Sequence, residues 1–347
     1  MTILLLMQKQ SLTTNMTIIT CAMKFHEPFL VSNYFNLRKF SKEVLWIIIN
    51  NDDAKLDLPD LIEQDQKIVI QKGPPLDTTY GAIAIGVHHA KSLEIASRQV
   101  KTRYTLILDP DFVVINWNLI MRELSKINQN KVVAIGTPWF PTWYRKKVNS
   151  LAPHFVLIKS AIIQNQFEWY PIDLVPEKLK IKDTFQARPR SDWPIFRYPI
   201  FKQILLYFFN RTKINTEYDT FGSTEILAKQ NKVTFLLPQL TRNQLAKLSP
   251  ILKFKIGRMI EKIIPPKYRY LLRPFTIAPF ELDFSSQHIE HWVVGNEIFG
   301  VHMRSFGAGK LLSKDLGAIE EFGRHLNFLT NGKMTTENLA PKEWRYK

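Results

Sequence analysis

Residues 105–112 read Thr-Leu-Ile-Leu-Asp-Pro-Asp-Phe, an apolar run that ends abruptly in two carboxylates, Asp109 and Asp111. A strand buried in a parallel sheet is almost continuously apolar, and open α/β sheets bind ligands just beyond the carboxyl ends of such strands. Carboxylate oxygens suit hard cations such as Mg²⁺ or Mn²⁺, which hold the phosphates of nucleotide substrates. Asp-Pro-Asp is also ordinary turn chemistry, so this motif alone leaves two interpretations, a metal-binding pair and a turn.

The segments around this run alternate between strand-like and helix-like patterns, which is typical of an α/β domain with a mostly parallel sheet. The expected strands cover residues 17–22, 44–49, 67–70, 104–108, 132–135 and 153–159. The expected helices cover about 28–40, 80–97 and 117–127. After Gly136 the alternation fades, and prolines and aromatic residues become dense. The sequence therefore predicts a Rossmann-like sheet flanked by helices, followed by a different C-terminal part.

Composition limits the class of protein. With 347 residues, 45% of them hydrophobic, the chain can form one large domain or two joined ones. Its single cysteine, Cys21, excludes an intramolecular disulfide and a cysteine-rich zinc site, as expected in a reducing compartment. The apolar run at residues 3–7 is too short for a signal peptide or a membrane span. We expect a cytoplasmic protein without a transmembrane helix.

The formal net charge of +16 implies an anionic partner. Residues 247–273 form a basic stripe, which on a helix would flank an apolar face in the manner of an interfacial membrane helix. A helix packed on the rest of the protein with a solvated basic face is the alternative. No zinc-finger or RNA-recognition signature is present, so no nucleic-acid partner is expected.

Several motifs follow one another in a fixed order. They are an apolar strand at 17–20, Asn50-Asn51-Asp52-Asp53, Tyr80-Gly81 with Gly86-Val87-His88-His89-Ala90, and the turn at 108–111. Their order and spacing resemble the nucleotide-sugar glycosyltransferases of the GT-A fold, particularly the non-processive enzymes of glycosyltransferase family 2. The resemblance is clear over residues 16–165 and looser up to His302. One departure is Ala84, where many relatives have asparagine two residues before the glycine.

The resemblance implies contacts with a nucleotide-sugar donor. The loop at residues 23–27 would meet the nucleotide. One of Asn51, Asp52 and Asp53 would hydrogen-bond the base or ribose, with Asp52 the first choice and an ordinary turn the alternative. The segment Tyr80-Gly81 would pass beneath the ribose and diphosphate, because glycine lets the backbone approach closely.

The resemblance also implies a divalent metal site. Asp109 and Asp111 would hold Mn²⁺ or Mg²⁺ against the donor, and His302 would complete the ligands unless it has a structural role. Arg304 would contact the diphosphate, because guanidinium matches phosphate geometry. The neighbouring His88 and His89 are interpreted as surface or packing residues.

The acceptor region is expected around residues 217–222, ahead of the apolar segment 233–237. The resemblance makes Asp219 the candidate catalytic base, with Glu217 and then Asp173 in reserve. A carboxylate there would take the proton of the attacking hydroxyl, which gives inversion at the anomeric carbon. A helix cap is the alternative role for Asp219.

The expected organisation is a catalytic domain over residues 16–240, with a nucleotide-binding half at about 16–137 and an acceptor half at about 138–240. A basic C-terminal extension over 241–347 would complete the site near His302. The processive signature Gln-x-x-Arg-Trp is absent, so we expect transfer of a single hexose to a glycan or lipid-linked acceptor in surface polysaccharide synthesis. Peripheral contact with the inner face of an anionic membrane is a further expectation. The alternative is a catalytically silent GT-A-like domain that binds glycans or membranes.

Overall fold

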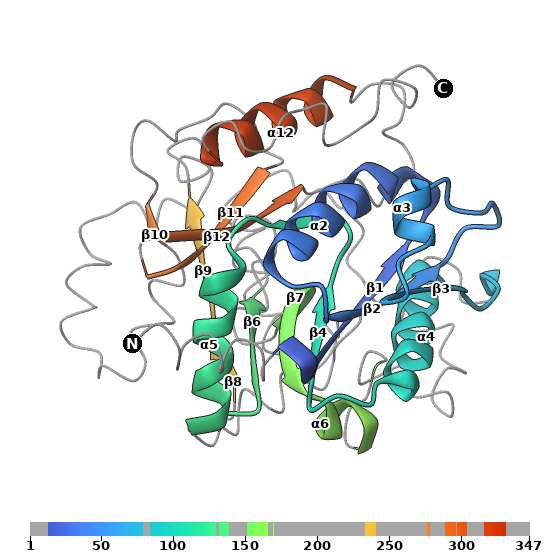
Figure 1. The fold of residues 1–347 in the computed structure, drawn as a ribbon, viewed down its shortest axis with the longest axis horizontal. Coiled ribbons are helices and arrows are strands. Elements are labelled where there is room, and N and C mark those ends of the chain that lie inside the picture. The colour runs from blue at the N-terminus through green and yellow to red at the C-terminus, as the bar shows by residue number, and fades with distance from the viewer. Residues whose placement is uncertain are drawn as a thin grey trace, which may run out of the picture.

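The computed structural model describes the chain in several segments, which form two sheets with helices packed against them (Figure 1). The described residues are 13–78, 84–129, 132–138, 151–165, 169, 233–240, 276–277, 289–295, 297–303 and 316–330.

The larger sheet has seven strands in the order β3-β2-β1-β4-β7-β6-β8. Only β7 runs antiparallel to its neighbours, β4 and β6, while the other paired strands of this sheet are parallel. The mostly parallel sheet predicted from the sequence is therefore confirmed. The strands are β1 (Met16–Ala22), β2 (Leu45–Asn50), β3 (Ile68–Lys72), β4 (Tyr104–Leu108), β6 (Ala134–Pro138), β7 (Leu151–Lys159) and β8 (Val233–Phe235).

Helices cover both faces of this sheet, which explains why its central strands are apolar throughout. In β4, Leu106 and Leu108 pack in a cluster with side chains of α2 and α5, while Ile107 packs on the other face with α4 and α6. The helices are the 3-10 turn η1 (Lys24–His26), α2 (Glu27–Phe40), α3 (Asp60–Glu63), α4 (Ala84–Gln99), α5 (Trp117–Gln129), α6 (Ser160–Asn165) and α12 (Leu316–Leu329).

The smaller sheet has five strands in the order β10-β9-β11-β12-β5. Its edge strand β5 begins one residue after Asp111, so the Asp-Pro-Asp turn joins the two sheets. The helix α12 covers this sheet through Phe322 and Leu326. The strands are β5 (Phe112–Val114), β9 (Leu237–Leu240), β10 (Thr276–Ile277), β11 (Ile289–Val294) and β12 (Glu297–Met303).

Two glycines of the smaller sheet have a specific steric role. Gly295 follows β11 with φ of 65°, a left-handed conformation that suits the tight connection to β12. A Cβ added at Gly300 would overlap the ring of Phe112, so this glycine lets β12 lie close to β5. Close pairing of β12 with β5 brings the segment around His302 next to the Asp-Pro-Asp turn.

The sequence predicted most elements of the larger sheet to within a few residues. It did not predict β5, β9, β10, β11, β12, η1, α3, α6 or α12. The domain boundary at residue 240 stays a prediction. The basic stripe at residues 247–273 lies outside the described residues. Within the described part of the chain, every helix is too short or too polar to cross a bilayer.

Candidate metal centre

The turn after β4 is fixed by backbone hydrogen bonds to both sheets. The N–H of Asp109 donates to the carbonyl of His154 in β7 at 3.0 Å. The N–H of Met303 in β12 donates to the carbonyl of Asp111 at 2.9 Å. The two aspartates are therefore held by strands that are far apart in the sequence.

Asn33 of α2 supports the same turn from below. Its side chain, in a residue that is 1% exposed, donates to the carbonyls of Pro110 and Phe112 at 3.3 and 2.9 Å. Its amide oxygen accepts the N–H of Val114 at 3.2 Å. One buried side chain thus hydrogen-bonds three backbone groups of the turn and of the edge strand β5. The sequence analysis did not identify this residue.

Two imidazoles approach the carboxylate of Asp109 from different elements. His154 Nδ1 lies 2.8 Å from Asp109 Oδ2. His89 Nε2, from α4, lies 3.7 Å from Asp109 Oδ1. The three side chains are mostly buried. Because His154 hydrogen-bonds one oxygen, the position of the carboxylate is fixed in the fold.

A third imidazole faces Asp111. His302 Nε2 lies 3.4 Å from Asp111 Oδ1, and His302 Nδ1 lies 2.7 Å from Glu290 Oε2 in β11. Glu290 and His302 are 0% and 3% exposed. The ring of His302 is also 4.0 Å from that of His154, centroid to centroid. The two aspartates and two of the histidines therefore form one connected cluster.

The charges in this cluster are strongly coupled. Burial alone would raise the pKa of Asp109, but the hydrogen bond from His154 and the nearby imidazoles outweigh it and lower this pKa to about 2. Burial would lower the pKa of His302, but the carboxylates of Asp111 and Glu290 raise it to about 10. Burial lowers the pKa of His154 and of His89. Protonated His302 thus places a positive charge beside the buried carboxylates. A bound cation can supply this charge in its place.

These residues fit a divalent metal ion. Asp109, His154 and His302 each offer a ligand atom, and the three atoms lie within 4.8 Å of one another. Carboxylate oxygen and imidazole nitrogen together suit first-row transition metals such as Mn²⁺ and Zn²⁺. The contact of His302 with Glu290 matches the usual arrangement in which a ligating histidine donates its second N–H to a carboxylate.

His26, in the loop after β1, is a further buried imidazole of this region. The N–H of Met23 donates to His26 Nδ1 at 3.0 Å, so the neutral ring carries its proton on Nε2. Burial lowers the pKa of His26 to about 4, against the opposing effect of Asp111 and Asp109. The ring is therefore a neutral donor at physiological pH.

The loop after β2 contains the other acidic group that the sequence predicted. Asn50 organises it, since its side chain accepts the N–H of Asp52 at 2.9 Å and donates to the carbonyl of Ala54 at 2.8 Å. The N–H of Lys24 donates to Asp52 Oδ2 at 3.1 Å, which ties this loop to the one after β1. The side chain of Asp53 is fully exposed.

The neighbouring Asn51 points to the opposite face of the sheet from Asn50. The hydroxyl of Ser92 in α4 donates to Asn51 Oδ1 at 2.6 Å. Asn51 is therefore held on the α4 side, the side from which His89 approaches Asp109.

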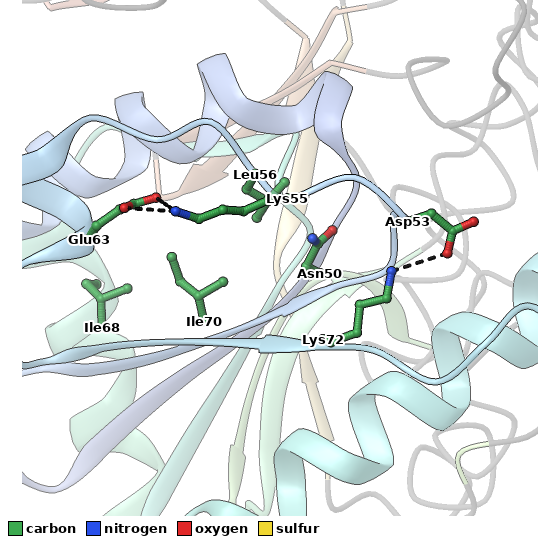
Figure 2. Close-up of a pocket in the computed structure, with 8 residues that line it drawn as sticks. All are labelled: Asn50, Asp53, Lys55, Leu56, Glu63, Ile68, Ile70 and Lys72. Atoms are coloured by element: carbon green, nitrogen blue, oxygen red, sulfur yellow. Dashed lines mark hydrogen bonds and ion pairs between the residues drawn. The ribbon is translucent and has the colours of Figure 1, made fainter.

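A cavity of about 510 Å³ lies beside this loop (Figure 2). Ion pairs stand at its two ends, Lys55 with Glu63 at 2.9 Å and Lys72 with Asp53 at 3.3 Å. The side chains of β3 that line this cavity lie on the face of the sheet covered by α2 and α3. His89 approaches Asp109 from α4, on the other face of the sheet. The lining residues are Asn50, Asp53, Lys55, Leu56, Glu63, Ile68, Ile70 and Lys72.

The structure brings together Asp109, Asp111 and His302, and their role as metal ligands stays a prediction. The sequence analysis missed His154 and Glu290, whose signal is only an ionisable residue inside an otherwise apolar strand. Other residues named from the sequence lie outside the described residues: Tyr80, Gly81, Asp173, Glu217, Asp219 and Arg304.

The two neighbouring histidines of α4 differ in their surroundings. His88 is buried, and its Nε2 lies at hydrogen-bond distance, 2.7 Å, from the carbonyl oxygen of Pro74. His89 instead approaches Asp109, which the interpretation as a surface or packing residue did not foresee.

No protein-family model matches the sequence, and no curated protein matches it either. Solved structures do match. The galactosyltransferase LgtC in complex with donor and acceptor sugar analogues is 12% identical over 95% of this chain and 99% of its own, with a TM-score of 0.48. The mannosyltransferase PcManGT from Pyrobaculum calidifontis, in complex with GDP-Man and Mn²⁺, is 12% identical with a TM-score of 0.34.

The match to PcManGT covers 44% of this chain and 47% of the mannosyltransferase, so it spans about half of each. A cytidylyltransferase from Leptospira borgpetersenii serovar Hardjo-bovis is 12% identical over 43% of this chain and 62% of its own, with a TM-score of 0.28. Two of these structures are glycosyltransferases and one is a cytidylyltransferase.

Proposed function

We propose that this protein is a metal-dependent glycosyltransferase that moves one sugar from a nucleotide-sugar donor to a glycan or lipid-linked acceptor. The observation that carries this proposal is the cluster of Asp109, Asp111, His154 and His302 beyond the carboxyl end of β4. Ligands of open, mostly parallel sheets bind at this edge. Burying carboxylates costs free energy when histidine is the only cationic group beside them. A bound metal ion would lower this cost, which favours an ion in the working protein.

The residues of the cluster would divide the work. Asp109 and Asp111 would hold the divalent ion, with His302 as a nitrogen ligand. When bound, the ion neutralises the charge that develops on the departing diphosphate. His154 keeps the Asp109 carboxylate oriented, and Asn33 keeps the turn in place, so little reorganisation is needed when the donor binds.

The donor nucleotide would lie along the same edge, over the loops after β1 and β2. The hydrogen bond from Lys24 N–H to Asp52 joins these loops into one surface, and Asp52 or the exposed Asp53 would contact the base or ribose. In this proposal the segment Tyr80-Gly81 contacts the ribose and diphosphate, and Arg304 contacts the diphosphate.

The acceptor side follows the resemblance stated above. Asp219, with Glu217 in reserve, would remove the proton from the acceptor hydroxyl, so that the sugar is transferred with inversion. We place the work of the enzyme in surface polysaccharide or glycan synthesis in the cytoplasm. The basic residues of 247–273 would contact the inner face of an anionic membrane.

The test is nucleotide release from a panel of UDP-, GDP-, CMP- and dTDP-sugars, with and without Mn²⁺. We expect release from one donor class that requires the metal, is lost in Asp111→Asn and is retained in Asp60→Asn, an exposed carboxylate at the start of α3. Absence of release from every donor, together with glycan or liposome binding that Asp111→Asn leaves unchanged, would instead support a catalytically silent domain.

A further inference from the structure

The ligand atoms of the metal centre are already assembled from distant parts of the chain. Asp109 follows β4, His154 lies in β7 and His302 lies in β12, yet one ligand atom from each lies within 4.8 Å of the others. A site of two carboxylates alone usually needs substrate phosphates and several waters to complete the coordination of its ion. This centre offers nitrogen atoms from the protein in their place.

His302 is oriented for coordination before any ligand binds. Its Nδ1 contacts the fully buried Glu290 at 2.7 Å, which leaves Nε2 directed at Asp111, 3.4 Å away. A carboxylate that receives the Nδ1 proton fixes the tautomer of the ring, so the lone pair of neutral His302 lies on Nε2. Glu290 would therefore act on a bound ion only through His302, as a positioning residue.

His154 is fixed in the same way by the turn itself. Its side chain bonds the carboxylate of Asp109, and its carbonyl accepts the N–H of the same residue. Its ring lies 4.0 Å from the ring of His302, centroid to centroid. The two rings thus lie side by side, with His154 on Asp109 and His302 on Asp111.

We propose that Asp109, Asp111, His154 and His302 form a preformed centre that binds a transition-metal ion without nucleotide and discriminates against Mg²⁺, with Glu290 positioning His302. Imidazole nitrogen is a good ligand for ions such as Mn²⁺, Fe²⁺ and Zn²⁺, whereas Mg²⁺ requires octahedral oxygen ligands and gives up its waters reluctantly. The inference rests on the proposed function for the place of the ion, but metal binding can be measured without a donor.

The experiment uses the full chain freed of metal and free of nucleotide. Mn²⁺ binding is measured by electron paramagnetic resonance and calorimetry, alone and in competition with excess Mg²⁺. We expect one tight Mn²⁺ site that a tenfold excess of Mg²⁺ does not empty. Pulsed spectra should show coupling of the Mn²⁺ electron spin to nitrogen. A requirement for nucleotide, displacement by equimolar Mg²⁺ or absence of nitrogen coupling would each overturn the inference.

Variants assign the ligands. His154→Gln keeps a polar side chain but removes the imidazole, and Glu290→Gln keeps a hydrogen-bond acceptor for His302 but removes the charge. We expect about 10- to 100-fold weaker Mn²⁺ binding in each, and weaker nitrogen coupling in His154→Gln. His88→Gln is the matched control, because the imidazole of His88 hydrogen-bonds the carbonyl of Pro74 instead of the cluster. This variant should bind Mn²⁺ like the wild type.

Two features keep the outcome clear. The nitrogen coupling of the wild-type protein tests the inference even where a variant fails to fold. Tight nucleotide-free Mn²⁺ binding without sugar transfer would overturn the proposed function and leave this inference standing. Sugar transfer that Mg²⁺ supports as well as Mn²⁺ would support the proposed function and overturn this inference.

Discussion

Two acidic loops follow the strands that pair with either side of β1, and their surroundings differ completely. The side chains of Asp109 and Asp111, after β4, are 16% and 11% exposed and meet imidazoles from α4, β7 and β12. Asp53, after β2, is fully exposed and pairs with Lys72. Similar local sequences thus give a buried candidate metal centre in one place and a solvated loop in the other, because different elements pack over them.

This difference has energetic consequences. A buried carboxylate whose partner is removed becomes an uncompensated charge, at a cost of about 3–5 kcal/mol. An exposed ion pair contributes about 0–1 kcal/mol. Substitutions in the two loops should therefore separate clearly, both in stability and in activity.

The largest effect is expected for Asp111→Asn. The change removes one charged ligand from the proposed centre, so metal-dependent nucleotide release should fall at least about 100-fold. Steady-state turnover at saturating Mn²⁺ measures the loss, with Asp60→Asn as the control. Equal turnover of Asp111→Asn and wild type would contradict the claim that the turn after β4, and not the loop after β2, holds the metal ion.

The next effect concerns the asparagines that support each loop. Asn33→Asp removes two N–H donors beneath the buried turn and should lower the free energy of unfolding by about 1–3 kcal/mol. Asn50→Asp removes a single donor, the one to Ala54, and should cost less. Urea unfolding of both variants makes the comparison, and a larger loss in Asn50→Asp would contradict it.

Another carboxylate, Asp65, lies away from both loops and tests the effect of partial burial. Burial raises the pKa of Asp65, but the N–H of Lys67 and the guanidinium of Arg38, 2.6 Å away, lower it by a larger amount. The pKa of Asp65 is therefore lower in the folded protein than in the unfolded one. Its contribution is therefore present above the unfolded pKa of about 3.9 and is lost as the pH falls through the folded pKa.

We expect Asp65→Asn to lower stability by about 1 kcal/mol at pH 7 and less near pH 2. Unfolding in urea across this pH range checks the sign. A variant whose deficit grows on acidification would contradict the assignment.

The smallest effect on stability is expected for Asp53→Asn, which breaks only the exposed pair with Lys72 and should change the free energy of unfolding by less than about 1 kcal/mol. If this loop contacts the donor, the same variant should raise the KM for the nucleotide sugar and leave Mn²⁺ affinity unchanged. Weaker Mn²⁺ binding in Asp53→Asn would indicate that the ion binds at the loop after β2, which would contradict the assignment of the metal centre to the turn after β4.

The sequence was sufficient for features that are set locally. The apolar runs of β1, β2 and β4 and the spacing of the helices between them predicted the mostly parallel sheet. The resemblance of the motifs led to Asp109, Asp111 and His302, which the structure brings together.

The sequence was insufficient where a role depends on pairing between distant strands. His154 meets Asp109 only because β7 pairs antiparallel with β4 in one register, and Glu290 meets His302 only through the register of β11 with β12. A slip of one residue would turn either side chain to the other face of its sheet. His89 likewise depends on the rotation of α4 against the sheet.

The most direct test is an anomalous diffraction map from crystals grown with Mn²⁺ and without nucleotide, recorded at the manganese absorption edge. We expect one strong peak at bonding distance from the carboxylates of Asp109 and Asp111 and from the imidazoles of His154 and His302. A map with no peak there, or with its strongest peak at Asp53, would contradict the assignment of this cluster as the metal centre.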